Sequence, residues 1–296
     1  MLPAMAKLCC GISYPHLRSM TGLQRVAVAA LGQEFVHRQK VGQMPLPAWT
    51  SCGRRSWGNT SEESERAAGQ HDCVEETELS YQRQGQQALQ EALEIVRDAD
   101  GWRMEMSEGS GDAIYSKVRH GNHKVFRLEA ELEASPEELY DILFVKVEEM
   151  HQWNPSIGQI KVLKHIGKET TVTHEVSAET VGNLIGQRDF LSVRHSLKTA
   201  ECIYLGGAPT HLETLPPQPG FVRAEDGPTC IIIQPSANCA GKSRFTWLLN
   251  MDVKGWIPKS LVNQALPRAQ LDFTKHLRRR LAAGGHEPAA VTNIHS

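Results

Sequence analysis

From residue 150 onward the sequence alternates apolar and polar residues in one short run after another, and then ends in a single long helical pattern. Alternation with a period of two is typical of strands that bury one face, and short returns between such runs favour antiparallel pairing. The strand candidates cover residues 159–166, 171–178, 190–197, 202–207, 221–226, 229–235 and 244–256. This pattern predicts a large antiparallel sheet and excludes a fold of alternating strands and helices.

The last element differs from these strands. Between Ser260 and Leu281 one apolar stripe recurs at helical spacing, and it comprises Val262, Ala265, Leu266, Ala269, Phe273 and Leu277. Arginines at 278–280 end the pattern, where cations favour the negative end of the helix dipole. Pro267 lies inside it and removes a backbone donor, at a cost of about 3 kcal/mol. We therefore expect a kink, or a later start of the long helix.

Two shorter helical patterns precede most of the strands. The first covers residues 79–98 and ends near the sequence DADGW. The second begins at Ser135, which is a good N-cap, because Pro136 suits the first turn and Glu138 completes a capping box. Between these helices, residues 113–118 and 123–134 alternate like antiparallel strands.

This order of elements predicts an α+β fold, in which a curved antiparallel sheet packs on a long C-terminal helix. Such a sheet has two faces, and only one substantial late helix is present to cover the concave one. If that helix does not fill the concavity, an apolar cavity remains. We expect this cavity to bind an apolar ligand.

Charge and cysteine content exclude several classes of protein. The formal net charge of −2 and the pI near 6.7 argue against nucleic acid as a partner. The seven cysteines are odd in number and form no C-x-x-C pair, which argues against a disulfide framework. The longest early apolar run, residues 26–31, is far shorter than the roughly 20 residues that span a bilayer.

The familiar motifs of catalysis and cofactor binding do not occur in the sequence. It contains no G-x-S-x-G elbow, P-loop, dinucleotide fingerprint or zinc-spaced cluster of cysteine and histidine. His174 and Glu175 begin like a zinc-protease motif, but the second histidine of that motif is missing. We therefore expect no enzyme, no catalytic residues, no metal site and no cofactor.

The charge balance divides the N-terminal region from the rest. Residues 1–61 contain seven basic residues and one acid, whereas residues 62–79 are strongly acidic. Residues 18–31 form a short amphipathic helix on a helical wheel, with Arg18 and Arg25 opposite the apolar side. This composition predicts a mitochondrial presequence over residues 1–40, a flexible linker over 41–78 and a disordered tail over 282–296. The alternative is a helix packed on the body of the protein.

Glu175 and Arg194 stand out within the strand candidates, because each lies on the face opposite the valines of its own strand. We interpret them as an ion pair directed into the cavity, since buried charges persist only when paired and hydrogen-bonded. The alternative is a solvent-facing pair of little energetic consequence. By strand parity His174 and His195 face the other side. A charged pair in an apolar tunnel suits a long apolar ligand with one polar end, such as a sterol.

Four segments of the sequence resemble the START-domain sterol carriers. They are QWNPSIGQIKVLKHIGKET, THEVSAETVGNLIGQRDFLSVR, RAEDGPTC and TWLLNMDVKGWIPKSLVNQ, and residues 1–34 are similar to the leader of mitochondrial members. The resemblance implies a helix-grip fold over residues 79–281. It also implies that the chain binds cholesterol and promotes its transfer from the outer to the inner mitochondrial membrane for steroid hormone synthesis.

The resemblance further implies roles for particular residues and partners. It places near the ligand Glu175, Arg194, Met150, Ser177, Ala269 and Phe273. It also implies a second ion pair between Asp112 and Arg278, whose breakage would let the final helix loosen as a lid. The implied partners are cholesterol, the mitochondrial outer membrane surface and the import machinery, with no nucleic acid and a monomeric state.

Departures from this family suggest a divergent paralogue. The Arg-Arg-x-Ser kinase motif of the family is altered at residues 54–57, where Trp57 stands at the acceptor position. No arginine pair follows Arg194, and Glu201 lies near the position of the second serine. Control by phosphorylation is therefore in doubt, and Glu201 is a candidate mimic of the phosphorylated form.

A lipid-sensing interaction module with the same fold but no transfer activity is the alternative function.

Overall fold

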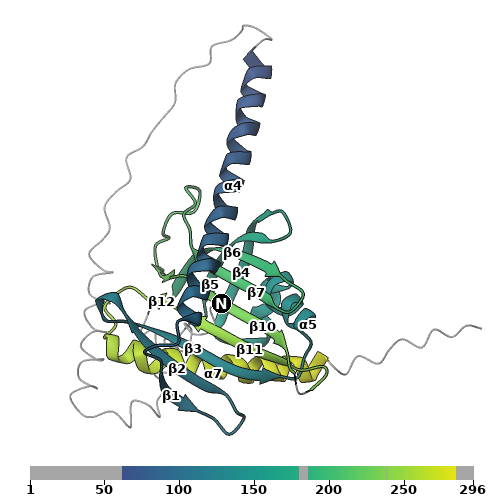
Figure 1. Ribbon diagram of the computed structural model, residues 1–296. Coiled ribbons are helices and arrows are strands. Elements are labelled where there is room, and N and C mark those ends of the chain that lie inside the picture. The colour runs from purple at the N-terminus through teal and green to yellow at the C-terminus, as the bar shows by residue number, and fades with distance from the viewer. Residues whose placement is uncertain (1–61, 180–185, 238, 285–296) are drawn as a thin grey trace, which may run out of the picture.

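A ten-stranded sheet forms the centre of the molecule (Figure 1). The computed structural model describes residues 62–179, 186–237 and 239–284. The strands pair in the order β1-β2-β3-β11-β10-β7-β6-β5-β4, and β8 pairs with β6 beside this path. Their bounds are β1 Arg103–Ser107, β2 Ala113–Arg119, β3 His123–Leu132, β4 Ile157–Ile166, β5 Thr170–Ser177, β6 Arg188–Lys198, β7 Ile203–Pro209, β8 Val222–Arg223, β10 Thr229–Pro235 and β11 Ser243–Leu249. The strands β9 (Glu225–Asp226) and β12 (Met251–Asp252) form a separate pair.

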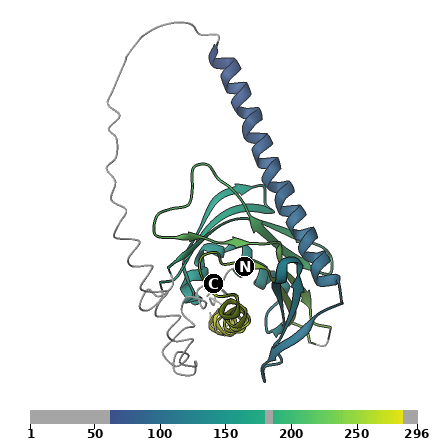
Figure 2. The same ribbon diagram turned by 90° about the vertical axis from the view of Figure 1, so that its left-hand side faces the viewer.

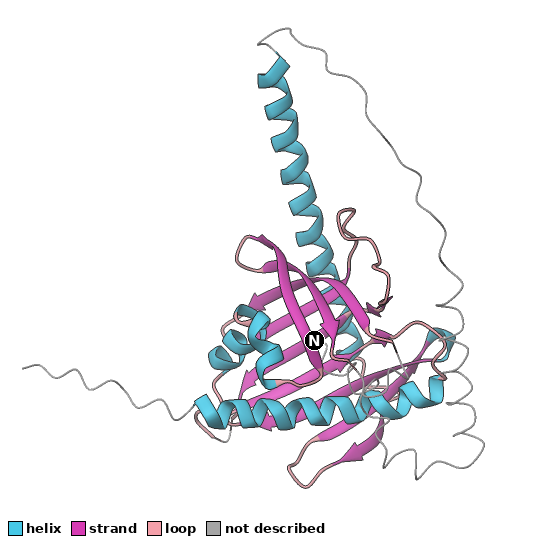
Figure 3. Cartoon of the chain, turned by 180° about the vertical axis from the view of Figure 1, so that it is seen from behind, coloured by secondary structure: helices cyan, strands magenta, loops and turns pink. Residues whose placement is uncertain are grey.

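Two long helices lie on opposite faces of this sheet. Figure 2 looks along α7 (Lys259–Gly284) and shows the sheet curving over it, while α4 (Glu62–Arg97) lies on the outer side. Seen from behind in Figure 3, α7 crosses in front of the strands. The shorter helices α5 (Pro136–Tyr140) and α6 (Met150–Trp153) are joined by a π-helical turn at Asp141–Val145 and a 3-10 turn at Val147–Glu149. A further 3-10 turn covers His120–Asn122.

Strand alternation divides the buried side chains between the two faces. Val172 pairs with Val193 across β5 and β6, and both belong to a cluster that packs under α4 with Tyr81 and Ala88. Residues of opposite parity, such as Phe190, belong to the larger cluster that packs against α7. We call these two sides the outer face and the inner face. The inner face is the concave side of the predicted architecture, so the α+β fold with a curved antiparallel sheet is confirmed.

The start of α5 follows the predicted cap. Ser135 has an extended backbone, its hydroxyl accepts a hydrogen bond from the backbone N–H of Glu138 at 3.1 Å, and Pro136 occupies the first turn. The cap satisfies one of the amide donors that a helix start leaves without a partner. It fixes the point at which the chain leaves β3 and begins to cross the inner face.

The structure differs from the predicted elements at three points. Helix α4 begins at Glu62, so it includes residues 62–78 of the expected linker; these residues are rich in Glu, which is a helix former as well as polar. Helix α7 runs through Pro267 from Lys259, because the apolar packing of Leu266 and Ala269 on the sheet outweighs one lost hydrogen bond. Strand β1 was not predicted, although its sequence alternates between polar and apolar residues, and its side chains are mostly exposed.

Several predicted segments lie outside the described residues. They are the presequence over 1–40, the linker up to residue 61, the altered kinase motif at 54–57 and the tail beyond residue 284. Glu201, the candidate phosphorylation mimic, does lie within the described residues, and it is exposed between β6 and β7. None of the helices in the described ranges is long and apolar enough to cross a membrane.

Gly206 provides a test of the packing between α4 and the outer face. A Cβ atom at Gly206 would lie 2.7 Å from the Cβ of Leu89 and 3.0 Å from its Cα, which is too close for either residue to keep its position. We expect Gly206→Ala to lower the free energy of unfolding by about 1–3 kcal/mol, measured by urea denaturation.

Gly109→Ala is the matched control, because no atom lies within 4 Å of a Cβ added there. An equal effect of the two substitutions would show that close approach of α4 does not matter to stability.

Candidate functional site

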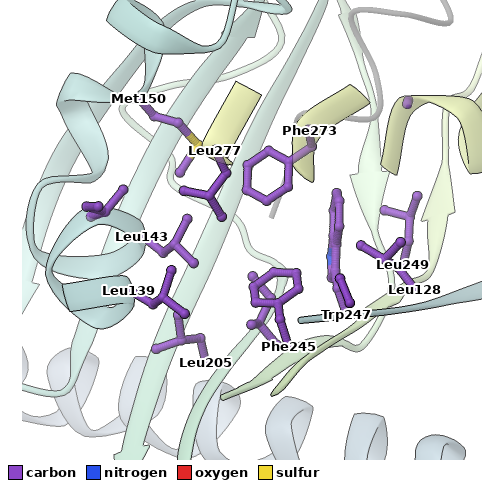
Figure 4. Close-up of a cluster of buried hydrophobic side chains, with 14 of the residues drawn as sticks. Leu128, Leu139, Leu143, Met150, Leu205, Phe245, Trp247, Leu249, Phe273 and Leu277 are labelled. Carbon is purple, nitrogen blue, oxygen red and sulfur yellow. The ribbon is translucent and has the colours of Figure 1, made fainter. Parts of the chain in front are cut away.

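Large apolar side chains from the sheet, α7 and the short helices form the wall of the inner face. Figure 4 shows Phe273 and Leu277 of α7 facing Phe245 and Trp247 of β11, with Met150 of α6 beside them. The ring of Phe273 lies 5.1 Å from that of Trp247, 6.4 Å from that of Phe245 and 5.6 Å from that of Trp153. This wall offers an apolar ligand contacts of the kind found in lipid-binding sites.

The sheet register places Glu175 and Arg194 on this same inner face. Glu175 lies opposite Phe190, and Arg194 lies opposite Thr171, with the intervening pair Thr173 and Ser192 on the same side. Glu175 is 3% exposed and Arg194 is 4% exposed. The alternative of a solvent-facing pair is therefore wrong.

Glu175 and Arg194 do not touch each other, contrary to the expected direct ion pair. The register separates them by four residues, from Phe190 to Arg194, which is about 13 Å along a strand at about 3.3 Å per residue. No nitrogen–oxygen contact within 4.0 Å joins the two described side chains. Strand parity predicts a shared face, but it does not give the distance along the strands.

Arg194 is held by a backbone carbonyl and an aromatic ring instead of by a carboxylate. Its Nη2 donates a hydrogen bond to the carbonyl oxygen of Leu143 at 2.7 Å, and its guanidinium lies 5.8 Å from the centre of the Phe144 ring. Its Nε is buried without a hydrogen-bond partner among the described residues. Burial lowers the pKa of Arg194 to about 10, opposed by the nearby Glu175 and Asp226, so the guanidinium stays charged at neutral pH.

Glu175 is a buried carboxyl with an altered affinity for its proton. No hydrogen bond joins it to another described residue. Burial raises the pKa of Glu175 to about 7, and the positive charge of Arg194 opposes this rise. The group therefore exists in both protonation states near neutral pH.

Asp226 is a third ionisable residue of the inner face, and the sequence reasoning missed it. It is 2% exposed, its Oδ1 has no hydrogen-bond partner within the described ranges, and it pairs across β9 and β12 with the buried Met251. Burial raises the pKa of Asp226 well above its ordinary value; the nearby Glu175 adds to the rise and Arg194 opposes it. The signal available in the sequence was its position two residues after the apolar Ala224, which places both side chains on one face of a strand. The structure agrees, because the intervening Glu225 is exposed.

The remaining residues that the resemblance placed near a ligand are all buried. Met150, Ala269 and Phe273 belong to the cluster of the inner face. Ser177 is two residues beyond Glu175 in β5, so alternation places it on the same face. Its hydroxyl accepts a hydrogen bond from the backbone N–H of Arg188 at 3.0 Å. The structure thus places these residues on one side of the sheet, and their contact with a ligand stays a prediction.

Asp112 and Arg278 form a two-pronged salt bridge between the start of β2 and α7. Arg278 Nη1 donates to Asp112 Oδ2 at 2.7 Å, and Nη2 donates to Oδ1 at 2.6 Å. Thr274 also donates to Asp112 Oδ2 at 3.0 Å, and Arg278 Nη2 contacts the carbonyl oxygen of Glu131 at 2.9 Å. Asp112 is fully buried, and its hydrogen bond raises the pKa of Arg278. This contact attaches α7 to the sheet.

His174 and His195 lie on the outer face, as strand parity predicted. His174 Nε2 lies 3.0 Å from Asp189 Oδ2, which also accepts a hydrogen bond from Arg223 Nη2 at 2.8 Å. The Thr170 hydroxyl lies 2.8 Å from His195 Nδ1, and burial lowers the pKa of that histidine. These histidines have structural partners away from the inner face. In the part of the chain that is described, no cluster of His, Cys, Asp or Glu could hold a metal ion.

Comparison with known proteins agrees with this architecture. The family model described as START domain matches residues 82–286. The chain belongs to the START family. The steroidogenic acute regulatory protein, mitochondrial, of Danio rerio is 45% identical over 291 residues, which cover 98% of this chain and 99% of that protein. The protein of the same name from Bos taurus is 44% identical over 281 residues, covering 95% and 96%.

Solved START-family structures share the fold at lower sequence identity. The human StAR-related lipid transfer protein 5 gives a TM-score of 0.61 at 20% identity, covering 68% of this chain and 95% of that one. Human STARD10 gives a TM-score of 0.57 at 19% identity, covering 64% and 78%. At these identities the likeness shows the fold alone, which is the helix-grip fold expected from the sequence.

Glu175 should make stability depend on pH. Between its ordinary pKa of 4.5 and the raised value of about 7, the folded chain keeps a proton that the unfolded chain has lost. The free energy of unfolding therefore contains a contribution that is complete below pH 4.5 and is lost as pH rises through 7. We expect Glu175→Gln to remove this dependence, a difference of at most about 3 kcal/mol. Urea unfolding at a series of pH values measures it.

The exposed Glu213→Gln is the control for Glu175→Gln. Parallel stability curves for the parent and Glu175→Gln would contradict the raised pKa.

The Asp112–Arg278 salt bridge should contribute strongly to stability. Asp112→Asn leaves the guanidinium of Arg278 without its carboxylate partner, and Arg278 is itself partly exposed. We expect a loss of about 2–3 kcal/mol in the free energy of unfolding. The control is Glu133→Gln, which breaks an exposed pair with Lys242 and should cost less than about 1 kcal/mol. Equal losses would show that the buried pair has no special role.

Proposed function

We propose that this START-family protein binds cholesterol on its inner face and promotes cholesterol transfer from the outer to the inner mitochondrial membrane. This transfer supplies steroid hormone synthesis. The observation that carries the proposal is the similarity over nearly the whole chain, at 44–45% identity, to proteins named steroidogenic acute regulatory protein, mitochondrial. The apolar wall with a few buried polar groups is the site that such a ligand needs.

The apolar wall supplies most of the affinity for a sterol. Burying roughly 400 Å² of sterol surface at about 25 cal/mol per Å² stabilises the complex by about 10 kcal/mol before the costs of association. Glu175 and Arg194 then select which end of the ligand enters, because the sterol hydroxyl is the one group that can hydrogen-bond to them. Since these residues are well separated along the strands, each serves as an individual polar contact or acts through bridging water.

Release of the ligand requires α7 to move away from the sheet. The helix contributes Ala269, Phe273 and Leu277 to the inner face, and the Asp112–Arg278 salt bridge attaches it. Breaking this salt bridge would weaken the attachment. Trp256 is 81% exposed shortly before α7 begins, and an indole ring at such a position is suited to contact a membrane–water interface.

The mitochondrion is the location of this activity, in agreement with the relatives, which are named as mitochondrial proteins. Residues 1–40 act as the presequence, because their basic amphipathic character suits recognition by the import machinery. The carrier works as a monomer at the mitochondrial outer membrane surface. We propose that it is a carrier and not an enzyme, in line with the relatives, which are named as regulatory proteins.

Sterol binding should depend on both charged residues. In the purified full-length chain we expect saturable binding of a fluorescent sterol, weakened about tenfold by Glu175→Ala and by Arg194→Ala, because each removes a buried polar contact. Arg244→Ala and Glu213→Ala, which alter exposed residues, should bind like the parent. If no binding occurs in the parent, the proposed function is wrong. Binding without transfer between vesicles would instead support a lipid-sensing module.

The rate of sterol release should depend on the attachment of α7. We expect the double variant Asp112→Asn with Arg278→Gln to release bound sterol at least about threefold faster than the parent, because the helix loses its salt bridge to the sheet. Stopped-flow measurement of fluorescent sterol leaving the protein for excess vesicles tests this. Glu133→Gln serves again as the exposed control. An unchanged release rate in the double variant would rule out the gate.

A further inference from the structure

Several buried polar atoms of the inner face have no hydrogen-bond partner among the described residues, and three of these atoms lie on β6 and β9. They are Ser192 Oγ and Arg194 Nε on β6, and Asp226 Oδ1 on β9. Leaving a buried polar group without a partner costs about 1–3 kcal/mol, so such groups in native proteins usually contact a ligand or ordered water. Three such atoms on strands that pack together indicate a position at which a polar group of a ligand, or an ordered water, binds.

The register places these atoms on the same side of the sheet. Ser192 and Arg194 have the parity of Phe190, a residue of the cluster under α7. Asp226 pairs with Met251 and follows Ala224 at the alternate position, and both of these also belong to that cluster. Strand β9 packs against β6 and β7. Glu175 and Arg194 are close enough to Asp226 to influence its pKa, and Asp226 influences the pKa of Arg194. The groups therefore surround one part of the inner face.

One sterol hydroxyl cannot satisfy this whole set. The backbone positions that carry these polar side chains extend along β6 from the register of Glu175, opposite Phe190, to Arg194, about 13 Å at about 3.3 Å per residue. A hydroxyl reaches a partner about 3 Å away. A ligand that uses the full length of this strip needs a second oxygen, placed beside Ser192 and Asp226 when the first is held near Glu175 or Arg194.

We propose that Ser192 and Asp226 form a second polar subsite, which binds an additional uncharged oxygen of a sterol, either a hydroxyl or a ketone. The proposal deepens the proposed function and rests on it. An uncharged group is favoured because Glu175 and Asp226 together offer two carboxyls against the single guanidinium of Arg194. An anionic group would be repelled by whichever carboxyl is ionised.

The protonation state of Asp226 agrees with this role. Its pKa is raised by burial and by Glu175, which favours a neutral carboxyl that can donate one hydrogen bond and accept another. The Ser192 hydroxyl can also donate and accept. The subsite is thus able to bind either a hydroxyl or a ketone, whereas cholesterol, with one oxygen, leaves part of the strip without a partner.

Competition binding with sterols of different oxygen content tests the subsite. Full-length protein carrying a fluorescent sterol is titrated with cholesterol and with derivatives that carry one extra hydroxyl or ketone at different ring and side-chain positions. We expect at least one derivative to bind about tenfold more tightly than cholesterol, as one good hydrogen bond allows. Both Ser192→Ala and Asp226→Leu should reduce this preference to about twofold or less, while cholesterol affinity changes little.

Two further variants separate recognition from folding. Asp226→Asn keeps a side chain that donates and accepts, so it should retain the preference. Glu225→Gln alters the exposed neighbour in the same strand and should also retain it. Ser192→Ala removes a hydroxyl that has no partner in the described protein, so its fold is not at risk.

The outcomes distinguish this proposal from the proposed function. Saturable cholesterol binding with no preferred derivative, or a preference that both Ser192→Ala and Asp226→Leu leave intact, would overturn the subsite alone. The same holds if Asp226→Asn loses the preference as fully as Asp226→Leu. If the parent binds neither cholesterol nor any derivative, the subsite and the sterol carrier function are both wrong.

Discussion

The packing of α7 against the concave face of the sheet is the constraint on which the site depends. It encloses Glu175, Arg194 and Asp226 with an apolar wall, so each charge is removed from water. The strongest described contact between helix and sheet is the paired hydrogen bonding of Arg278 with Asp112, supported by Thr274. Asp112 is fully buried whereas Arg278 is partly exposed, so solvent screens this contact less than it screens a surface pair. A small change in it therefore has a large effect on how firmly the helix is held.

The enclosed polar groups make ligand recognition selective. In an apolar enclosure a polar group without a partner is costly. The buried polar groups therefore disfavour a wholly apolar ligand, and they favour a ligand with matching oxygens. The single guanidinium of Arg194 balances at most one of the two carboxylates, and the pKa values of Glu175 and Asp226 rise accordingly with burial. The face is thus suited to neutral molecules with few oxygens. The outer face, packed under α4, serves the fold: there Asp189 Oδ2 contacts both His174 and Arg223.

The sequence predicted the elements that carry a strong periodic signal and missed those that depend on distance. Alternation was sufficient to predict most strands and to assign Glu175 and Arg194 to one face, because parity is a local property. It was not sufficient to show that these residues are apart along the strands, since register depends on pairing. Asp226 was missed although it lies in a predicted strand, because alternation alone did not show that its carboxyl is buried beside Glu175 and Arg194. Pro267 indicated a break that tertiary packing overrides, and residues 62–78 gave the same polar composition that a linker would have.

Transfer of cholesterol between membranes tests the central claim most directly. Purified full-length protein is mixed with donor vesicles that contain labelled cholesterol and with acceptor vesicles that have the lipid composition of the mitochondrial outer membrane. The account predicts transfer whose rate increases with protein concentration and falls when Arg194 is replaced by Ala. Protein that binds cholesterol but leaves the rate at the level of spontaneous exchange would contradict the account, because it would be a sensor of sterol and not its carrier.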